Sequence, residues 1–167
     1  VYGPHGTWTG GREKAPAAML RKANVSEESM EIWGNGKQTR SFTYIEDCLE
    51  GILRLMESEY AEPINLGSDE MVSMNELATI CLEIVGKKIP LKHVPGPEGV
   101  RGRNSENTLI KQVLGWAPEI RIRDGLKMTN VWLAEQIALQ KKAGKNVADL
   151  SSSKVVQQST ESLDQLS

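Results

Sequence analysis

The stretch Gly10-Gly-Arg-Glu-Lys-Ala-Pro-Ala-Ala-Met19, together with Gln38-Thr-Arg-Ser-Phe-Thr-Tyr44, decides the fold prediction. Proline is tolerated only in the first turn of a helix, so Pro16 predicts a helix over about residues 12–23 with Lys14 at its start. The second stretch is rich in β-branched and aromatic residues, which predicts a strand that carries Arg40. Neither charged side chain has an evident packing reason to be in its place.

The rest of the chain predicts short, mixed elements. Asn35-Gly36 separates two runs rich in β-branched and aromatic residues, which indicates a β-hairpin over residues 30–45 with a type I′ turn. Ser73 and Glu76 have the spacing of a capping box, so a helix is expected from there to Gly86. We also expect helices over residues 46–58, 107–114 and 123–142, a buried strand over 63–67 and an extended segment over 89–94. Such a mixture favours an α+β arrangement around a small sheet.

The composition limits the class of protein. A chain of 167 residues, 39% hydrophobic and 25% charged, is typical of a globular protein with its own core. The net charge of −2 argues against nucleic acid or a membrane surface as partners, and no apolar run could span a bilayer. Cys48 and Cys81 have no metal-ligand spacing with His5 or His93. We therefore expect no metal, two reduced structural thiols and a cytoplasmic location.

The chain divides by composition into two parts. Residues 1–144 have the pattern of a folded portion, whereas residues 145–167 are polar and predict a mobile tail. The folded portion has no Gly-rich dinucleotide turn after a strand, and no tyrosine is followed four positions later by a lysine. The chain alone therefore cannot build a dinucleotide pyrophosphate site.

The two opening stretches resemble the extended short-chain dehydrogenase/reductase family, in its sugar-nucleotide-modifying branch, and most of all the plant-type GDP-mannose 3,5-epimerases. The string after Gln38 is similar to the Arg-Asp-Phe-Thr-Tyr-Val-Asp-Asp string of many such enzymes, with Ser41 in place of the usual Asp. The resemblance implies an α/β fold class. The chain would be the α+β-like, substrate-binding C-terminal portion of an NAD(P)-binding Rossmann-fold enzyme, and the N-terminal dinucleotide-binding part would be absent from it.

The resemblance also implies an activity. NAD would oxidise GDP-mannose at C4, acid/base residues would invert C3 and C5, and re-reduction would give GDP-L-galactose for ascorbate and cell-wall sugar synthesis. Lys14 would be the catalytic acid, opposite a cysteine that is neither Cys48 nor Cys81. A positive charge at a helix start is opposed by the helix dipole, which suits a proton donor. We expect the full-length enzyme to be a homodimer, and this chain alone to be inactive.

The implied substrate-binding residues lie in four segments of the chain. An arginine offers a planar fork of donors that matches phosphate oxygens, and glycines let the backbone approach a ligand. These properties suit Arg40 and the two arginines of Gly99-Val-Arg-Gly-Arg-Asn104, of which the resemblance implies Arg103, with Arg101 in support. Asn65-Leu-Gly67 is expected to form a turn beside the pocket. The full implied set is Glu13, Lys14, Ala15, Lys22, Gln38, Thr39, Arg40, Arg103 and Ser153.

Two other interpretations of the sequence remain open. The first is another sugar-nucleotide epimerase or dehydratase of the same family, although such enzymes are expected to lack the Arg12-Glu-Lys-Ala15 string. The second is a truncated, non-catalytic binding or dimerisation module. Without the resemblance, Lys14 and the arginines could each be solvated surface side chains.

Overall fold

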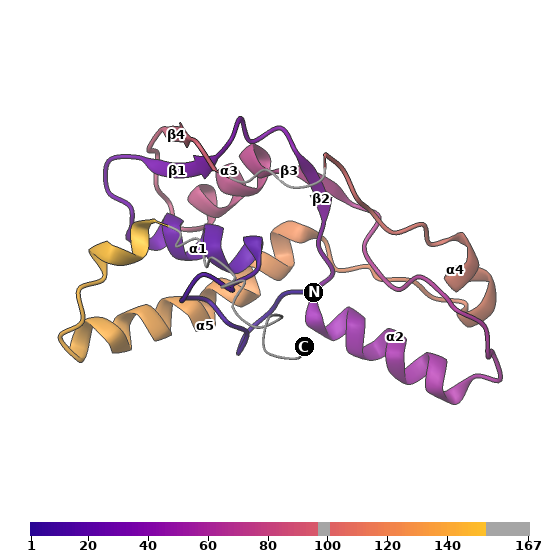
Figure 1. Cartoon of the computed structure of the whole chain (residues 1–167). Helices are drawn as coiled ribbons and strands as arrows, with labels where there is room; N and C mark the ends of the chain where they lie inside the picture. The colour runs from indigo at the N-terminus through magenta and orange to yellow at the C-terminus, as the bar shows by residue number, and fades with distance from the viewer. Residues whose placement is uncertain (97–100, 153–167) are drawn as a thin grey trace, which may run out of the picture.

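The computed structural model of the chain describes residues 1–96 and 101–152. Its helices are α1 (Ala15–Val25), α2 (Ile45–Glu57), α3 (Met74–Ile84), α4 (Thr108–Leu114) and α5 (Ile122–Lys142). Its strands are β1 (Met30–Trp33), β2 (Thr39–Ser41), β3 (Met71–Ser73) and β4 (Leu91–Val94), and a 3-10 turn, η1, covers Ala148–Ser151. Figure 1 shows β1 and β4 beside α3, with α1 and α5 beneath them and α2 and α4 at the other end of the molecule.

The predicted helices are confirmed with small shifts at their ends. Pro16 is the second residue of α1, where its missing N–H costs nothing, and Lys14 is the N-cap residue. The capping box is present: the Ser73 hydroxyl accepts from the Glu76 amide, and the Glu76 carboxylate accepts from the Ser73 amide. Gly86 follows α3 with a φ of 73°, as expected of a glycine that ends a helix.

The predicted hairpin over residues 30–45 is wrong. β1 pairs with β4 in parallel, and β2 pairs with β3 in antiparallel orientation. A type I′ turn needs positive φ at both central residues, but here Gly34 and Gly36 have positive φ and Asn35 does not. Met30 and Ile32 are fully buried, so β1 is placed by the core rather than by its sequence neighbour. Local residue pattern carries no information about a partner sixty residues away.

The buried strand predicted over residues 63–67 is also wrong. Pro63 and Asn65 are exposed, and the segment runs as a loop. Side chains hold its end: Asn107 donates to the Gly67 carbonyl at 2.8 Å, and the Ser68 amide donates to the Thr43 hydroxyl at 2.9 Å. Of the apolar residues that suggested a strand, Leu66 packs against α2, because a Cβ on Gly51 would meet it.

The core lies between α1, α3, α5 and β1. Its fully buried apolar members are Leu20, Ala23, Met30, Ile32, Leu77, Ala78, Cys81, Leu126 and Leu133. Tyr2 joins this core to the segment between β2 and α2: its amide donates to the Thr43 carbonyl at 3.0 Å and its carbonyl accepts from the Ile45 amide at 2.9 Å. The chain's first residues are thereby fixed at the start of α2.

α2 has an apolar face that is exposed to solvent in the described part of the chain. The exposed fractions of Leu49, Ile52, Leu53 and Met56 are 52%, 43%, 56% and 77%. Figure 1 shows that α2 extends away from α1 and α3. The buried Asp47 anchors the helix start, because its carboxylate accepts from the Glu119 and Ile120 amides at 3.2 and 2.8 Å. A contiguous exposed apolar face of this kind promotes association.

We therefore expect the chain, expressed alone, to associate through α2. The double substitution Leu53→Lys, Met56→Glu should shift it towards monomer in size-exclusion chromatography with light scattering. Glu57→Lys, on an exposed polar residue of the same helix, is the control and should change nothing. A wild-type sample that is monomeric and melts in one clean transition would contradict this expectation.

Gly125 lets α5 pass close to Tyr2. A Cβ at this position would meet the Tyr2 hydroxyl and would lie 3.0 Å from the Tyr44 ring. Gly125→Ala should therefore lower the free energy of unfolding by about 1–3 kcal/mol despite the better helix propensity of alanine. Unfolding in a denaturant measures this change in the free energy of unfolding. In a Tyr2→Phe background, which removes the clashing hydroxyl, the same substitution should cost less; an equal cost in both backgrounds would show that Tyr2 is not the cause.

Candidate functional site

β2 is hydrogen-bonded along both of its edges. One edge pairs with β3. On the other, the Thr39 and Ser41 amides donate to the carbonyls of Arg101 and Arg103, at 2.9 and 3.0 Å. Residues 101–103 therefore run beside β2 and in the same direction. Two segments that are far apart in sequence are fixed in register, and this brings Arg40 and Arg103 to one site.

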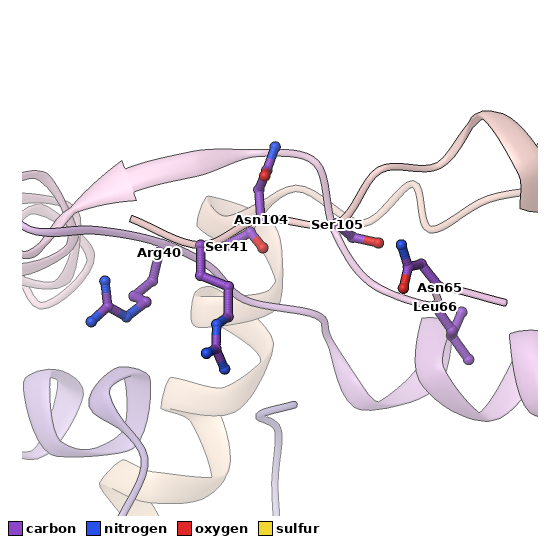
Figure 2. Close-up of a pocket in the computed structure, with 7 residues that line it drawn as sticks. Arg40, Ser41, Asn65, Leu66, Asn104 and Ser105 are labelled. Atoms are coloured by element: carbon purple, nitrogen blue, oxygen red, sulfur yellow. The ribbon is translucent and has the colours of Figure 1, made fainter. Parts of the chain in front are cut away.

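A shallow pocket of about 260 Å³ opens at this junction. β2 contributes Arg40 and Ser41, and two loops contribute the rest. Figure 2 shows its labelled residues in a row, with Arg40 and Ser41 towards one end, Asn65 and Leu66 at the other, and Ser105 between them. The full lining is Arg40, Ser41, Asn65, Leu66, Arg103, Asn104 and Ser105.

The lining is chemically suited to an anion. It holds two guanidinium groups, two side-chain amides and two hydroxyls, but no carboxylate. Arg40 is half-buried and donates to the Thr39 carbonyl at 2.6 Å, which fixes part of its fork. Across residues 1–96 and 101–152, neither Arg40 nor Arg103 forms a salt bridge. Two positive charges and several neutral donors favour a ligand with many oxygens, such as a diphosphate.

Lys14 and its neighbours form a second candidate cluster, at the start of α1. Lys14 is exposed and has an extended backbone, and its carbonyl accepts from the Ala18 amide at 3.0 Å. Ala15 is half-buried. The Glu13 carboxylate is inside the protein: its two oxygens accept from the Gly11 amide and from Arg21, both at 2.7 Å. A ligand contact of Glu13 would therefore come from its backbone.

Lys22 is buried in the interior and does not line the pocket. Its side chain donates to the Glu31 carbonyl at 2.9 Å and lies over the Trp33 ring, 5.9 Å from the centroid. Burial, and then the nearby positive charge of Arg21, lower the pKa of Lys22 from its ordinary value. Lys22 could contact the ligand, as predicted, only if its side chain gave up the hydrogen bond to Glu31 in β1.

Of the other predicted residues, Gln38 and Thr39 lie at the start of β2. The side-chain amide of Gln38 donates through Nε2 to the Trp33 carbonyl at 3.4 Å. Its side-chain oxygen, Oε1, is buried and has no partner within the described parts of the chain. Ser153 lies outside the described residues. The structure thus joins Arg40 and Arg103 in one pocket, places Gln38 and Thr39 next to Arg40 along the strand, and places Lys14 on a different element.

Sequence reasoning missed several lining residues. Asn104 and Ser105 directly follow Arg103, and Ser41 follows Arg40, so proximity in sequence was the available signal. Asn65 and Leu66 were expected beside the pocket, and they do line it. Arg21 was missed altogether, because nothing in a helical Leu-Arg-Lys run distinguishes a buried arginine from a solvated one.

Other kinds of site are not found in the described residues. Residues 1–96 and 101–152 contain no group of three or more His, Cys, Asp or Glu placed to hold a metal. They also form no helix long and apolar enough to cross a membrane. Cys48 and Cys81 are free thiols, and complete burial raises the pKa of Cys81, which makes it unreactive.

Comparison with known proteins shows which class of protein the chain resembles. Residues 1–67 match the model of the NAD dependent epimerase/dehydratase family. A solved UDP-glucose 4-epimerase with UDP-glucose, from Thermotoga maritima, has the same fold with a TM-score of 0.73 and 29% identity over 81% of this chain and 44% of that one. Over the aligned residues, the chain is therefore similar to proteins of the NAD dependent epimerase/dehydratase family.

Among curated proteins the similarity is more specific. The chain is 59% identical over 156 residues to GDP-mannose 3,5-epimerase 1 of Oryza sativa subsp. indica. It has the same identity, over the same length, to GDP-mannose 3,5-epimerase of Arabidopsis thaliana. Each alignment covers 93% of this chain and 41% of the relative, so the chain spans about two fifths of the length of the curated relatives that it matches.

The pocket predicts a specific pattern of anion binding. Arg103→Gln and Arg40→Gln should each weaken pyrophosphate binding about ten- to hundredfold, because each removes charged hydrogen bonds worth roughly 1.5–3 kcal/mol. Isothermal titration calorimetry at fixed ionic strength measures the effect. Arg121→Gln is the matched control, since it makes the same charge change at an exposed arginine that does not line the pocket. An equal loss in the control would show that binding reflects net charge rather than this pocket.

Proposed function

We propose that the chain forms the substrate-binding part of a GDP-mannose 3,5-epimerase. In this proposal the complete enzyme, meaning the whole protein that carries this chain, converts GDP-mannose to GDP-L-galactose. The observation that carries the proposal is the pocket that unites Arg40 and Arg103, in a chain 59% identical to GDP-mannose 3,5-epimerases. The pocket alone suits a diphosphate; the identity supports this particular sugar nucleotide.

Arg40 and Arg103 are proposed to bind the diphosphate of GDP-mannose. Each guanidinium presents a planar pair of N–H donors to phosphate oxygens, and the two come from β2 and from the segment 101–103 that is hydrogen-bonded beside it. Asn104 and Ser105 also line the pocket, and the Asn104 side-chain amide is a neutral donor. Binding at the diphosphate orients the sugar without contacting its reacting carbons. This is how remote binding energy is used to position a reacting group.

Lys14 is proposed to move the proton at the sugar. Epimerisation at C3 and C5 requires a proton to be removed from one face of the ring and another to be delivered to the opposite face. Lys14 is exposed at the N-cap of α1, so its ammonium group can reach a bound ligand. We assign it the role of proton donor, opposite a base that is not among the described residues.

The described residues do not fit an NAD site. A dinucleotide site of this family needs a strand, a Gly-rich turn and a helix N-terminus in sequence, and within residues 1–96 and 101–152 no strand leads through such a turn into a helix. NAD is therefore proposed as a cofactor of the complete enzyme, held by residues other than those described.

Three further properties belong to the same proposal. The complete enzyme is proposed to act as a homodimer, as the family resemblance implies. It is placed in the cytoplasm, which is supported by the two free thiols, since a reducing compartment keeps cysteines unpaired. Its product would supply ascorbate and cell-wall sugar synthesis.

A second candidate function is that of another sugar-nucleotide enzyme. The fold is shared with a UDP-glucose 4-epimerase, and a diphosphate pocket serves any nucleotide sugar. The two functions differ in where the sugar changes. A 4-epimerase needs no proton donor at C3 or C5, so the requirement for Lys14 separates them. A non-catalytic binding module would retain pyrophosphate binding and show no turnover.

Lys14→Ala should therefore lower kcat of the complete enzyme by roughly 10²–10⁴-fold, the usual contribution of a general acid. The rate of formation of epimerised product from GDP-mannose measures it. Lys37→Ala, an exposed lysine in the loop between β1 and β2, is the control and should retain full turnover. A Lys14→Ala enzyme within about tenfold of wild type, under ~1.4 kcal/mol of barrier, would favour the second candidate.

A further inference from the structure

Arg21 connects three separate segments of the chain. One nitrogen of its guanidinium, Nη2, donates to Glu13 at 2.7 Å. The other, Nη1, donates to the carbonyls of Leu150 and Ser152, the latter at 2.9 Å. Arg21 itself lies in the middle of α1. The side chain therefore joins the loop before α1, α1 itself and the segment around η1.

This connection is buried, which makes it costly to break. The Arg21 and Glu13 side chains are only 3% and 4% exposed. Desolvation lowers the pKa of Arg21, and the Glu13 carboxylate opposes that shift. A buried charge without its partner is strongly destabilising, so the arrangement holds only while all partners are in place. Of the segment around η1, Val147 and Leu150 also pack against the core.

The loop that Glu13 closes is otherwise loosely specified. Gly10 and Gly11 have φ angles of 95° and 88°, and glycine has the widest backbone freedom of any residue. The Gly11 amide donates to the same Glu13 carboxylate that Arg21 holds. Lys14 is the next residue after Glu13. The position of the Lys14 backbone therefore depends on a carboxylate that Arg21 orients.

We propose that Arg21 is a positioning residue, and that residues 148–152 act through it to fix the loop that presents Lys14. The segment around η1 occupies one side of the guanidinium, which directs the other side onto Glu13. Glu13 in turn holds Gly11 and sets the start of α1. The link to catalysis rests on the proposed role of Lys14, whereas the mechanical link between η1 and Gly11 does not.

The mechanical link is tested by hydrogen–deuterium exchange in the complete protein. A stop after Gly144 removes the segment around η1, and a stop after Ser152 is the matched control that retains it. The first truncation should speed exchange in a peptide covering Gly11 by about tenfold or more, as expected when a charged hydrogen bond is lost, while the second should not. Equal exchange at Gly11 in the two truncations would overturn the proposal.

A point variant tests the same link without truncation. Arg21→Lys keeps the charge but loses the fork, so it cannot bond Glu13 and both carbonyls together. It should speed exchange at Gly11 and around residues 148–152 while the core of α3 stays protected. Loss of protection throughout would mean general unfolding, and the truncation pair then decides. Unchanged exchange at Gly11 and at residues 148–152 contradicts the proposal.

The link to catalysis is read from steady-state kinetics of the same truncations. Compared with the stop after Ser152, the stop after Gly144 should lower kcat about tenfold and leave KM for GDP-mannose within about threefold, because orientation of a proton donor affects the transition state. A merely structural role would lower the melting temperature and leave kcat unchanged. If exchange responds and the untruncated protein does not turn over GDP-mannose, the proposed function fails while the positioning role of Arg21 stands.

Discussion

The hydrogen bonds between β2 and residues 101–103 are the constraint on which the candidate site depends. Thr39 and Ser41 donate to the carbonyls of Arg101 and Arg103, and β3 holds the opposite edge of the strand. A strand fixed on both sides cannot slip, and a slip of one residue would turn Arg40 to the other face. The backbone thus sets the relation between two arginines that have no direct contact to hold them together.

At the start of α1, the backbone is restrained by a buried ion pair instead of by strand pairing. The helix starts with an exposed lysine and without a side-chain cap, so local sequence does little to fix its first turn. The Glu13–Arg21 pair, and the carbonyls that share Arg21, instead tie the residue before Lys14 to the middle of α1 and to the segment around η1. The proposed phosphate-binding and proton-transfer roles therefore depend on two different kinds of restraint: a strand register for the arginines, and buried charge compensation for Lys14.

The sequence predicted where helices begin and end, but it did not predict which strands pair with each other. Pro16, the Ser73–Glu76 capping box and Gly86 located helix ends because each acts on its own few neighbours. The hairpin at Asn35 failed because β1 is buried on the core and pairs with a strand some sixty residues later.

In the candidate site, too, some properties of residues could be predicted from the sequence and others could not. Arg40 and Arg103 were singled out from residue chemistry and family resemblance, and the structure does bring them to one pocket. Glu13 and Lys22 were expected to contact the ligand, yet both side chains are held inside the protein. Burial of a charge depends on which distant segments surround it, and so Arg21 gave no signal in the sequence.

The most direct test of the account is proton exchange at the sugar. The complete protein is incubated with GDP-mannose in D₂O, and the recovered sugar nucleotides are examined by proton NMR. The account predicts loss of the signals at C3 and C5, together with the appearance of GDP-L-galactose. Recovery of a sugar changed only at C4, with protium retained at C3 and C5, would contradict it.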